Sequence, residues 1–495
     1  MIVDARTLPS GTRIDADICV IGGGPAGITV ARSLIGRSAR VALLESGGLE
    51  PDPTTQELAR GESVGLPYYP LQTARLRCLG GTTAHWGGWC RPLDDDDFTV
   101  RSWVPHSGWP FAAAELSSYY DEAHRLCQLG PLSYNPAALG LTPPTVNGAI
   151  EPRVFRQSPP THFGKLYRDE LRRAGEITVY LHATVTRLET SSSRRVTEAS
   201  LATFAGQVLR ARASVFVLAT GGLENARLLL ASSLGNPELV GRFFMEHVDV
   251  PVGLFLPSRE GLPLDFFHVR KVASGRRRET VLGGLALSAA YAMRERVLGA
   301  YVTQLEPSPL DARELELSAT ERLFAGDVAS VVAEVVGGRA SEGVCPLIIA
   351  CEQAPNPDSR VTLAEERDRF DVPRLRLEWR LSELDHRTAR VAALALARAL
   401  GVAEQGRVRV SLPADTSSWP AYGEWHHMGT TRMHVDPRQG VVDRNCKVHE
   451  LENLYVAGSS VFPTSGYANP TLTLVAMSLR LGRHLREVLG AGGPA

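Results

Sequence analysis

One short glycine pattern constrains this chain more than any other feature of its sequence. Gly22, Gly24 and Gly27 form G-x-G-x-x-G directly after the apolar run 17–21 and before a helical stretch, 28–34. In such a unit the first glycine allows a tight turn, the second lets backbone approach a pyrophosphate, and the third lets the helix pack closely on the strand. The N–H groups at the start of the helix then face the phosphates. The pattern predicts a Rossmann-type, dinucleotide-binding unit.

An acidic residue completes this unit. A second apolar strand, 40–44, ends at Glu45, which follows Gly22 by 23 residues. A carboxylate at that strand end binds both ribose hydroxyls of a dinucleotide and disfavours a 2′-phosphate. If the glycines formed only a turn without a ligand, the acidic residue at the end of the second strand would have no explanation. The unit by itself does not separate NAD from FAD.

Size and charge narrow the class of protein. A chain of 495 residues exceeds what one compact core usually serves, so we expect two domains. The 53 basic and 54 acidic residues are balanced, which gives no electrostatic reason to expect a nucleic acid or a membrane surface as partner. No segment has the length and polarity of a membrane span or a signal peptide. The seven cysteines are scattered, which predicts a reducing cytoplasm and neither a disulfide framework nor a metal site.

Three further segments distinguish between the two cofactors. Residues 78–88 read Cys-Leu-Gly-Gly-Thr-Thr-Ala-His-Trp-Gly-Gly, which resembles the flavin-contacting glycine loop of the glucose–methanol–choline (GMC) oxidoreductases. Residues 424–433 and 440–473 resemble the histidine segment and the closing segment of the same family. The motif text is nearest to pyranose oxidase and related sugar- and polyol-oxidising enzymes. The resemblance implies that the cofactor is FAD.

The resemblance also carries the family's flavin contacts onto this sequence. A histidine at the position of His85 holds the flavin covalently in pyranose oxidase and its relatives, so the resemblance implies the same bond here. A structural histidine beside the flavin is the alternative. The further contacts implied are Gly80, Gly81, Thr82, Val185, Gly458, Asn469, Pro470 and Thr471.

Alcohol oxidation requires a base in addition to the flavin. The flavin takes the carbinol hydride, and histidine suits the hydroxyl proton because its ordinary pKa lies near neutrality. Counted back from Gly429, the family's catalytic histidine falls on His426, and His427 replaces the usual proline. The partner that holds the alcohol oxygen falls on Asn469. We expect the His427 side chain to point to the other face of an extended segment.

Segments typical of nucleotide-binding folds occur at the start, middle and end of the chain. We therefore expect one domain to be discontinuous and the other to be inserted into it. We predict an α/β fold with strands at 281–287 and 346–352, helices at about 317–336 and 383–400, and a loop at 50–75. The Rossmann-type FAD-binding domain would use 1–110, 160–250 and 425–495. The substrate-binding domain, an antiparallel sheet with helices, would use 111–159 and 251–424.

The resulting hypothesis is FAD-dependent oxidation of a CH–OH group in a sugar, glycoside or polyol by an oxidase or dehydrogenase. Oxygen, a quinone and a redox protein remain open as electron acceptors. A flavin-dependent lyase on the same scaffold and an oxidoreductase for a non-sugar alcohol are alternatives. A monooxygenase or a non-catalytic flavoprotein does not explain the paired His426 and Asn469. Glu352 and Gln353 either project towards the substrate or end a surface strand.

Overall fold

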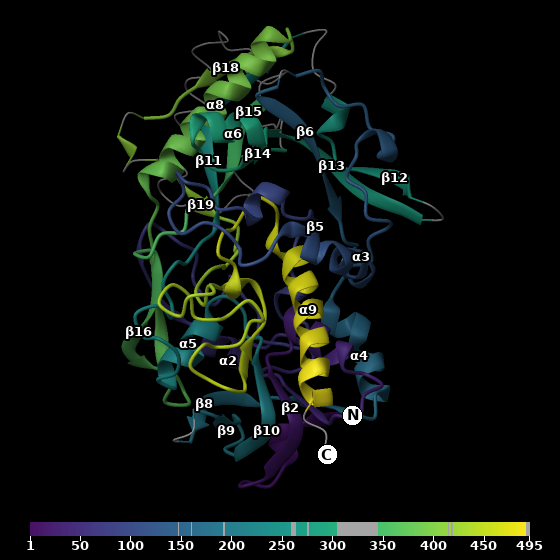
Figure 1. Ribbon diagram of the computed structural model, residues 1–495, viewed down its shortest axis with the longest axis vertical. Helices are drawn as coiled ribbons and strands as arrows, with labels where there is room; N and C mark the ends of the chain where they lie inside the picture. Colours follow the sequence, from purple (N-terminus) through teal and green to yellow (C-terminus); the bar gives the residue numbers. More distant parts are fainter. Residues whose placement is uncertain are drawn as a thin grey trace.

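The computed structural model describes residues 1–146, 148–159, 161–191, 194–258, 264–274, 277–303, 345–413, 415–416 and 419–491. It shows an elongated molecule with one large sheet in each half (Figure 1). The helix predicted at 317–336 lies outside the described residues. No helix within the described part of the chain is both long enough and apolar enough to cross a membrane.

The first sheet is built around the predicted β-α-β unit. It consists of β2 (Arg13–Ile21), α1 (Pro25–Ser33) and β3 (Val41–Leu44), and the helix begins earlier than predicted because Pro25 fits its first turn. β3 and the last four residues of β2 are buried, as in parallel sheets covered on both faces. The path β1-β7-β3-β2-β10 and the pair β10–β20 are parallel, whereas β8, β9 and β10 pair antiparallel. The remaining bounds are β1 (Ile2–Asp4), β7 (Ile177–Leu181), β8 (Thr184–Thr190), β9 (Val196–Ala202), β10 (Val208–Leu218) and β20 (Leu454–Val456).

The second sheet is antiparallel throughout its described pairs, as predicted. The predicted strands at 281–287 and 346–352 are parts of β13 and β15, and the helix predicted at 383–400 is α8 (Glu383–Val402). α8 begins at a capping box in which Ser382 and Asp385 bond each other's backbone N–H. The strands are β5 (Trp89–Cys90), β6 (Ile150–Gln157), β11 (His247–Pro257), β12 (Arg270–Ser274), β13 (Arg277–Leu287), β14 (Ala300–Val302), β15 (Cys345–Glu352), β18 (Gly406–Val410) and β19 (Tyr422–Gly423).

Helix α9 (Pro470–Ala491) runs along the long axis of the molecule and packs against α1 and α3 (Figure 1). Gly482 allows this packing, because a Cβ there would lie 1.8 Å from the Ser33 hydroxyl. The other described α-helices are α2 (Pro53–Gln56), α3 (Ser117–Leu126), α4 (Phe163–Arg173), α5 (Glu224–Ala231) and α6 (Ala289–Glu295). This packing holds the start of α9, and Asn469 just before it, against the nucleotide-binding half of the molecule.

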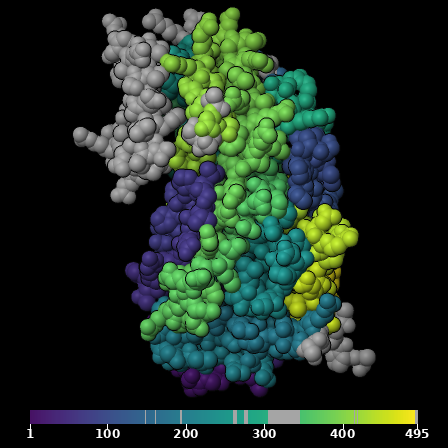
Figure 2. Space-filling view, turned by 90° about the vertical axis from the view of Figure 1, so that its left-hand side faces the viewer, coloured from purple at the N-terminus to yellow at the C-terminus, as the bar shows by residue number. Residues whose placement is uncertain are grey.

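A third, small sheet corrects the loop predicted at 50–75. β4 (Gly61–Gly65) lies in that segment and pairs in parallel with β17 (Pro373–Trp379), which pairs with β16 (Arg360–Arg367). Because β4 is short and partly exposed, its sequence shows neither the polar–apolar alternation nor the apolar run that would predict a strand. Figure 2 shows the green surface of the segment after 345 reaching from the top of the molecule into its lower half.

The sheets support the proposed division into two domains in outline. Every strand of the first sheet falls in the segments proposed for FAD binding, and the second sheet draws mainly on the inserted segments. β5 and the start of β11 belong to the second sheet although the proposed bounds assign them to the first domain. The β16–β17 hairpin lies beside α5 in the lower half (Figure 1). The bounds themselves stay a proposal.

Candidate active site

A cavity of about 460 Å³ opens at the carboxyl ends of β2, β3, β10 and β20. Ligands of open α/β sheets bind at such strand ends, and the volume is that of a ligand site. Gly27 and Gly80 stand behind the wall, because they are not among the lining residues. The predicted site residues that line the cavity are Gly22, Gly24, Glu45, Gly81, Thr82, His85, Val185, His426, Gly458, Asn469, Pro470 and Thr471.

The three glycines of the first turn have separate structural reasons. Gly22 has a φ of +107°, and a Cβ there would lie 2.4 Å from the Ala219 carbonyl oxygen. A Cβ on Gly27 would lie 1.9 Å from the Gly22 oxygen, so this glycine lets α1 pack against the turn. A Cβ on Gly24 would meet nothing within 4 Å and would stand in the cavity. No side chain within the described residues caps α1, so its first N–H groups are left for an anion.

The second glycine loop packs on the first one. The Gly80 N–H donates to the Gly23 carbonyl at 2.7 Å, and a Cβ on Gly81 would lie 3.1 Å from the Gly24 Cα. Gly80 has a φ of +100° and lies against Gly164 of α4. Among the described residues, Gly80 therefore lets the loop pack closely against α4.

Glu45 is oriented by backbone groups. Its two carboxylate oxygens each accept one N–H, from Gly23 and from Gly47, both at 2.8 Å. Burial raises the pKa of Glu45, and these two bonds oppose that rise. The Ser46 hydroxyl also donates to Oε1, at 3.3 Å. A carboxylate has about four lone-pair sites, so Oε2 can still accept a ribose hydroxyl.

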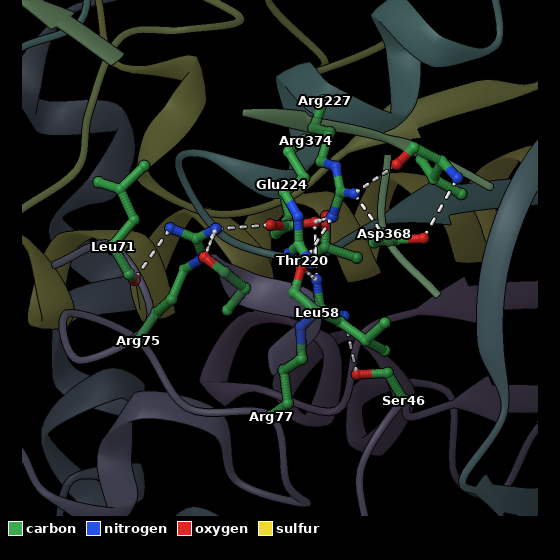
Figure 3. Close-up of polar contacts among 12 residues, drawn as sticks. Ser46, Leu58, Leu71, Arg75, Arg77, Thr220, Glu224, Arg227, Asp368 and Arg374 are labelled. Carbon is green, nitrogen blue, oxygen red and sulfur yellow. Dashed lines mark hydrogen bonds and ion pairs between the residues drawn. The ribbon is translucent and has the colours of Figure 1, made fainter. Parts of the chain in front are cut away.

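Sequence reasoning missed an arginine cluster beside Glu45, drawn in Figure 3. Glu224, at the start of α5, pairs with Arg75 at 2.7 Å and with Arg77 at 2.9 Å. Arg227, one turn along α5, pairs with Glu224 and with Asp368 and donates to carbonyls of the β16–β17 turn. Burial alone would raise the pKa of Glu224, but the three guanidinium groups outweigh it and hold the pKa far below its usual value. No motif signals this cluster, because its members come from three distant segments.

His426 also lines the cavity. Its backbone N–H donates to Glu246 Oε2 at 2.8 Å, and its Nδ1 lies 2.9 Å from His247 Nδ1 and 3.2 Å from Glu424 Oε2. These contacts occupy Nδ1 and leave Nε2 as the nitrogen for a ligand. Burial, with His247 and His427 nearby, lowers the pKa of His426 well below its ordinary value. The imidazole is therefore neutral near pH 7, as a base must be.

His427 also lines the cavity, but its ring serves packing. Its Nε2 lies 2.9 Å from the Tyr68 hydroxyl, which donates to Glu246, and the ring packs beside Phe244. Burial lowers the pKa of His427 to about 3. The two neighbouring histidines thus have different partners, although both line the cavity, and their opposite faces stay a prediction.

Three carboxyl groups surround the His426 backbone and ring. Burial raises the pKa of Glu246 to about 7 and that of Asp249 to about 6, and burial with Asp249 raises that of Glu424 well above its usual value. Ligand atoms of His247, Glu424 and His426 lie within 4.8 Å of one another. The 2.9 Å separation of the two Nδ1 atoms is that of a hydrogen bond. The prediction of no metal site stays a prediction.

His85 stacks on Trp425 at the cavity wall. The ring centroids lie 5.4 Å apart with an interplanar angle of 23°. Trp425 has a φ of +62°, which is rare for a bulky residue and occurs where the surroundings enforce it, often at functional sites. Tyr69 meets the same indole edge-on. His85 is exposed enough to reach a ligand, and its covalent role stays a prediction.

Glu352 and Gln353 are neither substrate-facing nor at a surface strand end. Both are fully buried. Glu352 pairs with Arg101, with Nη1 and Oε2 at 2.8 Å. Gln353 Oε1 accepts from the Glu246 N–H at 2.9 Å and from Trp379 Nε1 at 3.0 Å. Their position at a strand end did not reveal these partners, which come from other segments.

The cavity residues fit FAD. The uncapped start of α1, the open side of Gly24 and the Glu45 carboxylate would hold the pyrophosphate and the ribose, and His85 and His426 line the same cavity. The fold and the site together define a dinucleotide-dependent oxidoreductase.

Comparisons with known proteins identify the family of oxidoreductases to which the chain belongs. Residues 17–356 match the family described as FAD dependent oxidoreductase, and residues 355–478 match that described as GMC oxidoreductase. The chain belongs to the FAD-dependent oxidoreductases and, among these, to the GMC oxidoreductases, as the motifs predicted.

Individual relatives agree with this assignment. The chain is 22% identical to the fructose dehydrogenase large subunit of Gluconobacter japonicus, over 95% of this chain and 98% of that protein. It is 36% identical to pyranose 2-oxidase of Tricholoma matsutake over 80 residues, which are 16% of this chain and 14% of that protein. The crystal structure of pyridoxine 4-oxidase from Mesorbium loti matches with a TM-score of 0.56 and 18% identity, over 95% of this chain and 99% of that one.

Proposed function

We propose that the protein oxidises a CH–OH group of a sugar, glycoside or polyol, with His426 as general base and Asn469 as the residue that holds the alcohol oxygen. The observation that carries the proposal is the shared cavity: a neutral His426, with Nε2 left for a ligand, lines the same space as the nucleotide-binding glycines and Asn469. The similarity to a fructose dehydrogenase and to a pyranose 2-oxidase supports a sugar or a related polyol.

FAD, when bound, supplies the acceptor for the carbinol hydride. The chain's own residues orient the alcohol and move its proton. Asn469, just before the first turn of α9, holds the oxygen, and His426 Nε2 takes the hydroxyl proton. The Glu246 carboxylate holds the His426 backbone at 2.8 Å, which fixes where the ring stands.

An anaerobic screen of sugars, glycosides, polyols and simple alcohols tests this proposal. We expect one of the carbohydrate-like compounds to bleach the flavin absorbance of the purified protein. A compound that is cleaved without bleaching would instead indicate a flavin-dependent lyase. Bleaching by simple alcohols alone would indicate a non-sugar substrate. Reoxidation of the bleached enzyme with oxygen, a quinone or a redox protein then identifies the electron acceptor.

We also propose a covalent bond between the flavin and His85, and a cytoplasmic location. The exposed His85 ring at the cavity wall and the motif around it support the bond. Acid precipitation followed by mass measurement tests it, because non-covalent FAD stays in the supernatant. Buried free thiols such as Cys19 and Cys446 support a reducing compartment, and cell fractionation tests the location.

A further inference from the structure

Beside the proposed base lies a pair of acids that the proposed function does not use, and one of them, Glu424, lines the cavity itself. Asp249 on β11 and Glu424 just after β19 share a side-chain hydrogen bond. Glu424 Oε2 lies 3.2 Å from His426 Nδ1, on the side of the ring opposite Nε2. Asp249, Glu424 and His426 therefore form one chain of contacts that leads from the cavity into the second sheet.

The pair has no basic counter-ion. Burial raises the pKa of both carboxyls, and Asp249 raises that of Glu424 further, whereas the hydrogen bond with Glu424 lowers that of Asp249. No lysine or arginine within the described residues acts on either of them. Two carboxyls in contact cannot both ionise at low cost, so near neutral pH they share one proton. The other titratable groups that face the pair and His426 are Glu246, His247, Tyr301, Cys351 and His427.

We propose that Glu424 and Asp249 form a proton acceptor for His426 during alcohol oxidation. The proposal rests on the function proposed above and extends it to the fate of the proton. Glu424 is the positioning residue next to the ring, and Asp249 is the final acceptor.

The relay balances in protons. The alcohol loses its hydroxyl proton to His426 Nε2, while the two electrons leave with the hydride to FAD. His426 then releases its Nδ1 proton to Glu424 Oε2, and the proton that Glu424 held passes to Asp249. His426 ends neutral, and one carboxylate becomes a carboxylic acid.

His247 is the competing acceptor, because its Nδ1 also lies 2.9 Å from His426 Nδ1. Its ring is fully buried, and burial lowers its pKa to about 4. Asp249, with a pKa of about 6, binds the proton more tightly. His247 therefore fixes the orientation of the His426 ring, and the carboxyl pair takes the proton.

Infrared difference spectroscopy of the holoenzyme tests the relay. In the oxidised enzyme without alcohol, acidification through about pH 6 should convert one carboxylate to the acid, and Asp249→Asn should abolish that signal. On anaerobic reduction by substrate, the wild type should gain the carbonyl stretch of a protonated carboxyl. Glu424→Gln and Asp249→Asn should lack it, and Glu366→Gln, an exposed glutamate of β16, should keep it.

The kinetics give a second readout. Glu424→Gln should slow flavin reduction about tenfold, which is less than the loss of a general base, because His426 can still take the hydroxyl proton. Asp249→Asn removes a negative charge that stabilises the imidazolium, so the acid limb of its pH profile should move to lower pH. A slower rate with an unchanged limb and an unchanged carboxyl signal would overturn the relay in favour of a structural role.

Two further outcomes also decide the matter. If Glu424→Gln raises only the KM for substrates that carry an amino group, the pair binds a substrate cation and the relay is wrong. If no alcohol bleaches the wild-type flavin, the proposed function fails by itself. The pH titration of the oxidised enzyme still decides whether the pair shares a proton, and its absence would overturn the pair.

Discussion

The nucleotide-binding region and the catalytic region of the cavity shift the pKa values of carboxylates in opposite directions. At the nucleotide end, Glu224 touches Arg75, Arg77 and Arg227, and its pKa is held far below the ordinary value. At the catalytic end, no lysine or arginine within the described residues pairs with Glu424 or Asp249, and their pKa values are raised. Both sites are buried, so the presence or absence of arginine decides the sign of the shift.

This difference separates a fixed part of the site from a reactive part. A carboxylate whose pKa three guanidinium groups hold far below its usual value stays ionised near neutral pH, so it serves to hold structure. A carboxyl without a counter-ion can gain or lose a proton near neutral pH, which proton transfer requires. Substitutions at the two ends should therefore fail differently.

The largest effect is expected at the catalytic end. His426→Ala should lower the rate of flavin reduction by about 10²- to 10⁴-fold, the usual contribution of a general base. FAD content and the unfolding midpoint should stay near those of the wild type. Stopped-flow absorbance under anaerobic conditions measures the rate. An unchanged rate would remove His426 from the mechanism.

The pH dependence of the same rate follows from burial. The base works when neutral, and the pKa of His426 lies well below the ordinary histidine value. Reduction should therefore remain fast as pH falls through 6.5 and decline only at lower pH, through the folded-state pKa. A decline centred at or above the ordinary histidine value of about 6.5 would show that another group limits the rate.

Glu224→Gln should act on stability. It leaves Arg75 and Arg77 without their charged partner, and breaking a buried ion pair costs about 3 kcal/mol. Denaturant unfolding of the holoenzyme measures the loss, with Glu366→Gln as the matched surface control. If Glu224→Gln unfolds like the control, the arginine cluster does not hold the fold together, and the contrast between the two ends is lost.

Gly24→Ala tests the nucleotide end without disturbing the fold. The backbone at Gly24 suits alanine, with φ of −75°, and the added Cβ enters the cavity. FAD affinity should fall about tenfold, which is about 1.4 kcal/mol. Unfolding of the FAD-free protein should be unchanged. Gly401→Ala in α8, where a Cβ also meets nothing, is the control. Equal FAD affinity in both variants would place the pyrophosphate elsewhere.

Asn469→Ala should slow flavin reduction less than His426→Ala does, by about tenfold, because it misplaces the alcohol oxygen without removing the base. The KM for substrate should rise as well. Single-turnover measurements separate the two effects. A variant as inactive as His426→Ala would show that Asn469 takes part in proton transfer itself.

The smallest effect is expected for His427→Ala. Its ring contacts Tyr68 and Phe244, so its loss should change the reduction rate less than about fivefold, below the usual range for a general base. Comparison of the two histidine variants in one preparation checks the assignment. Greater damage in His427→Ala would reverse the roles of the neighbours.

The sequence by itself determined the β-α-β unit, the family and part of the cavity wall. The roles of four residues could be predicted because the tight turn, the close approach of backbone to a ligand and the acid at the strand end all lie within about 25 residues of chain. These residues are Gly22, Gly24, Gly27 and Glu45. His426 and Asn469 were placed by motif.

Only the tertiary structure decided the electrostatics. Glu224, Arg75 and Asp368 come from distant segments, as do Asp249 and Glu424, and no local pattern records which charges will meet. The same reason explains why Glu352 and Gln353 turned out to be buried partners of Arg101 and Trp379. A pKa depends on burial and on neighbours in space, and folding supplies both.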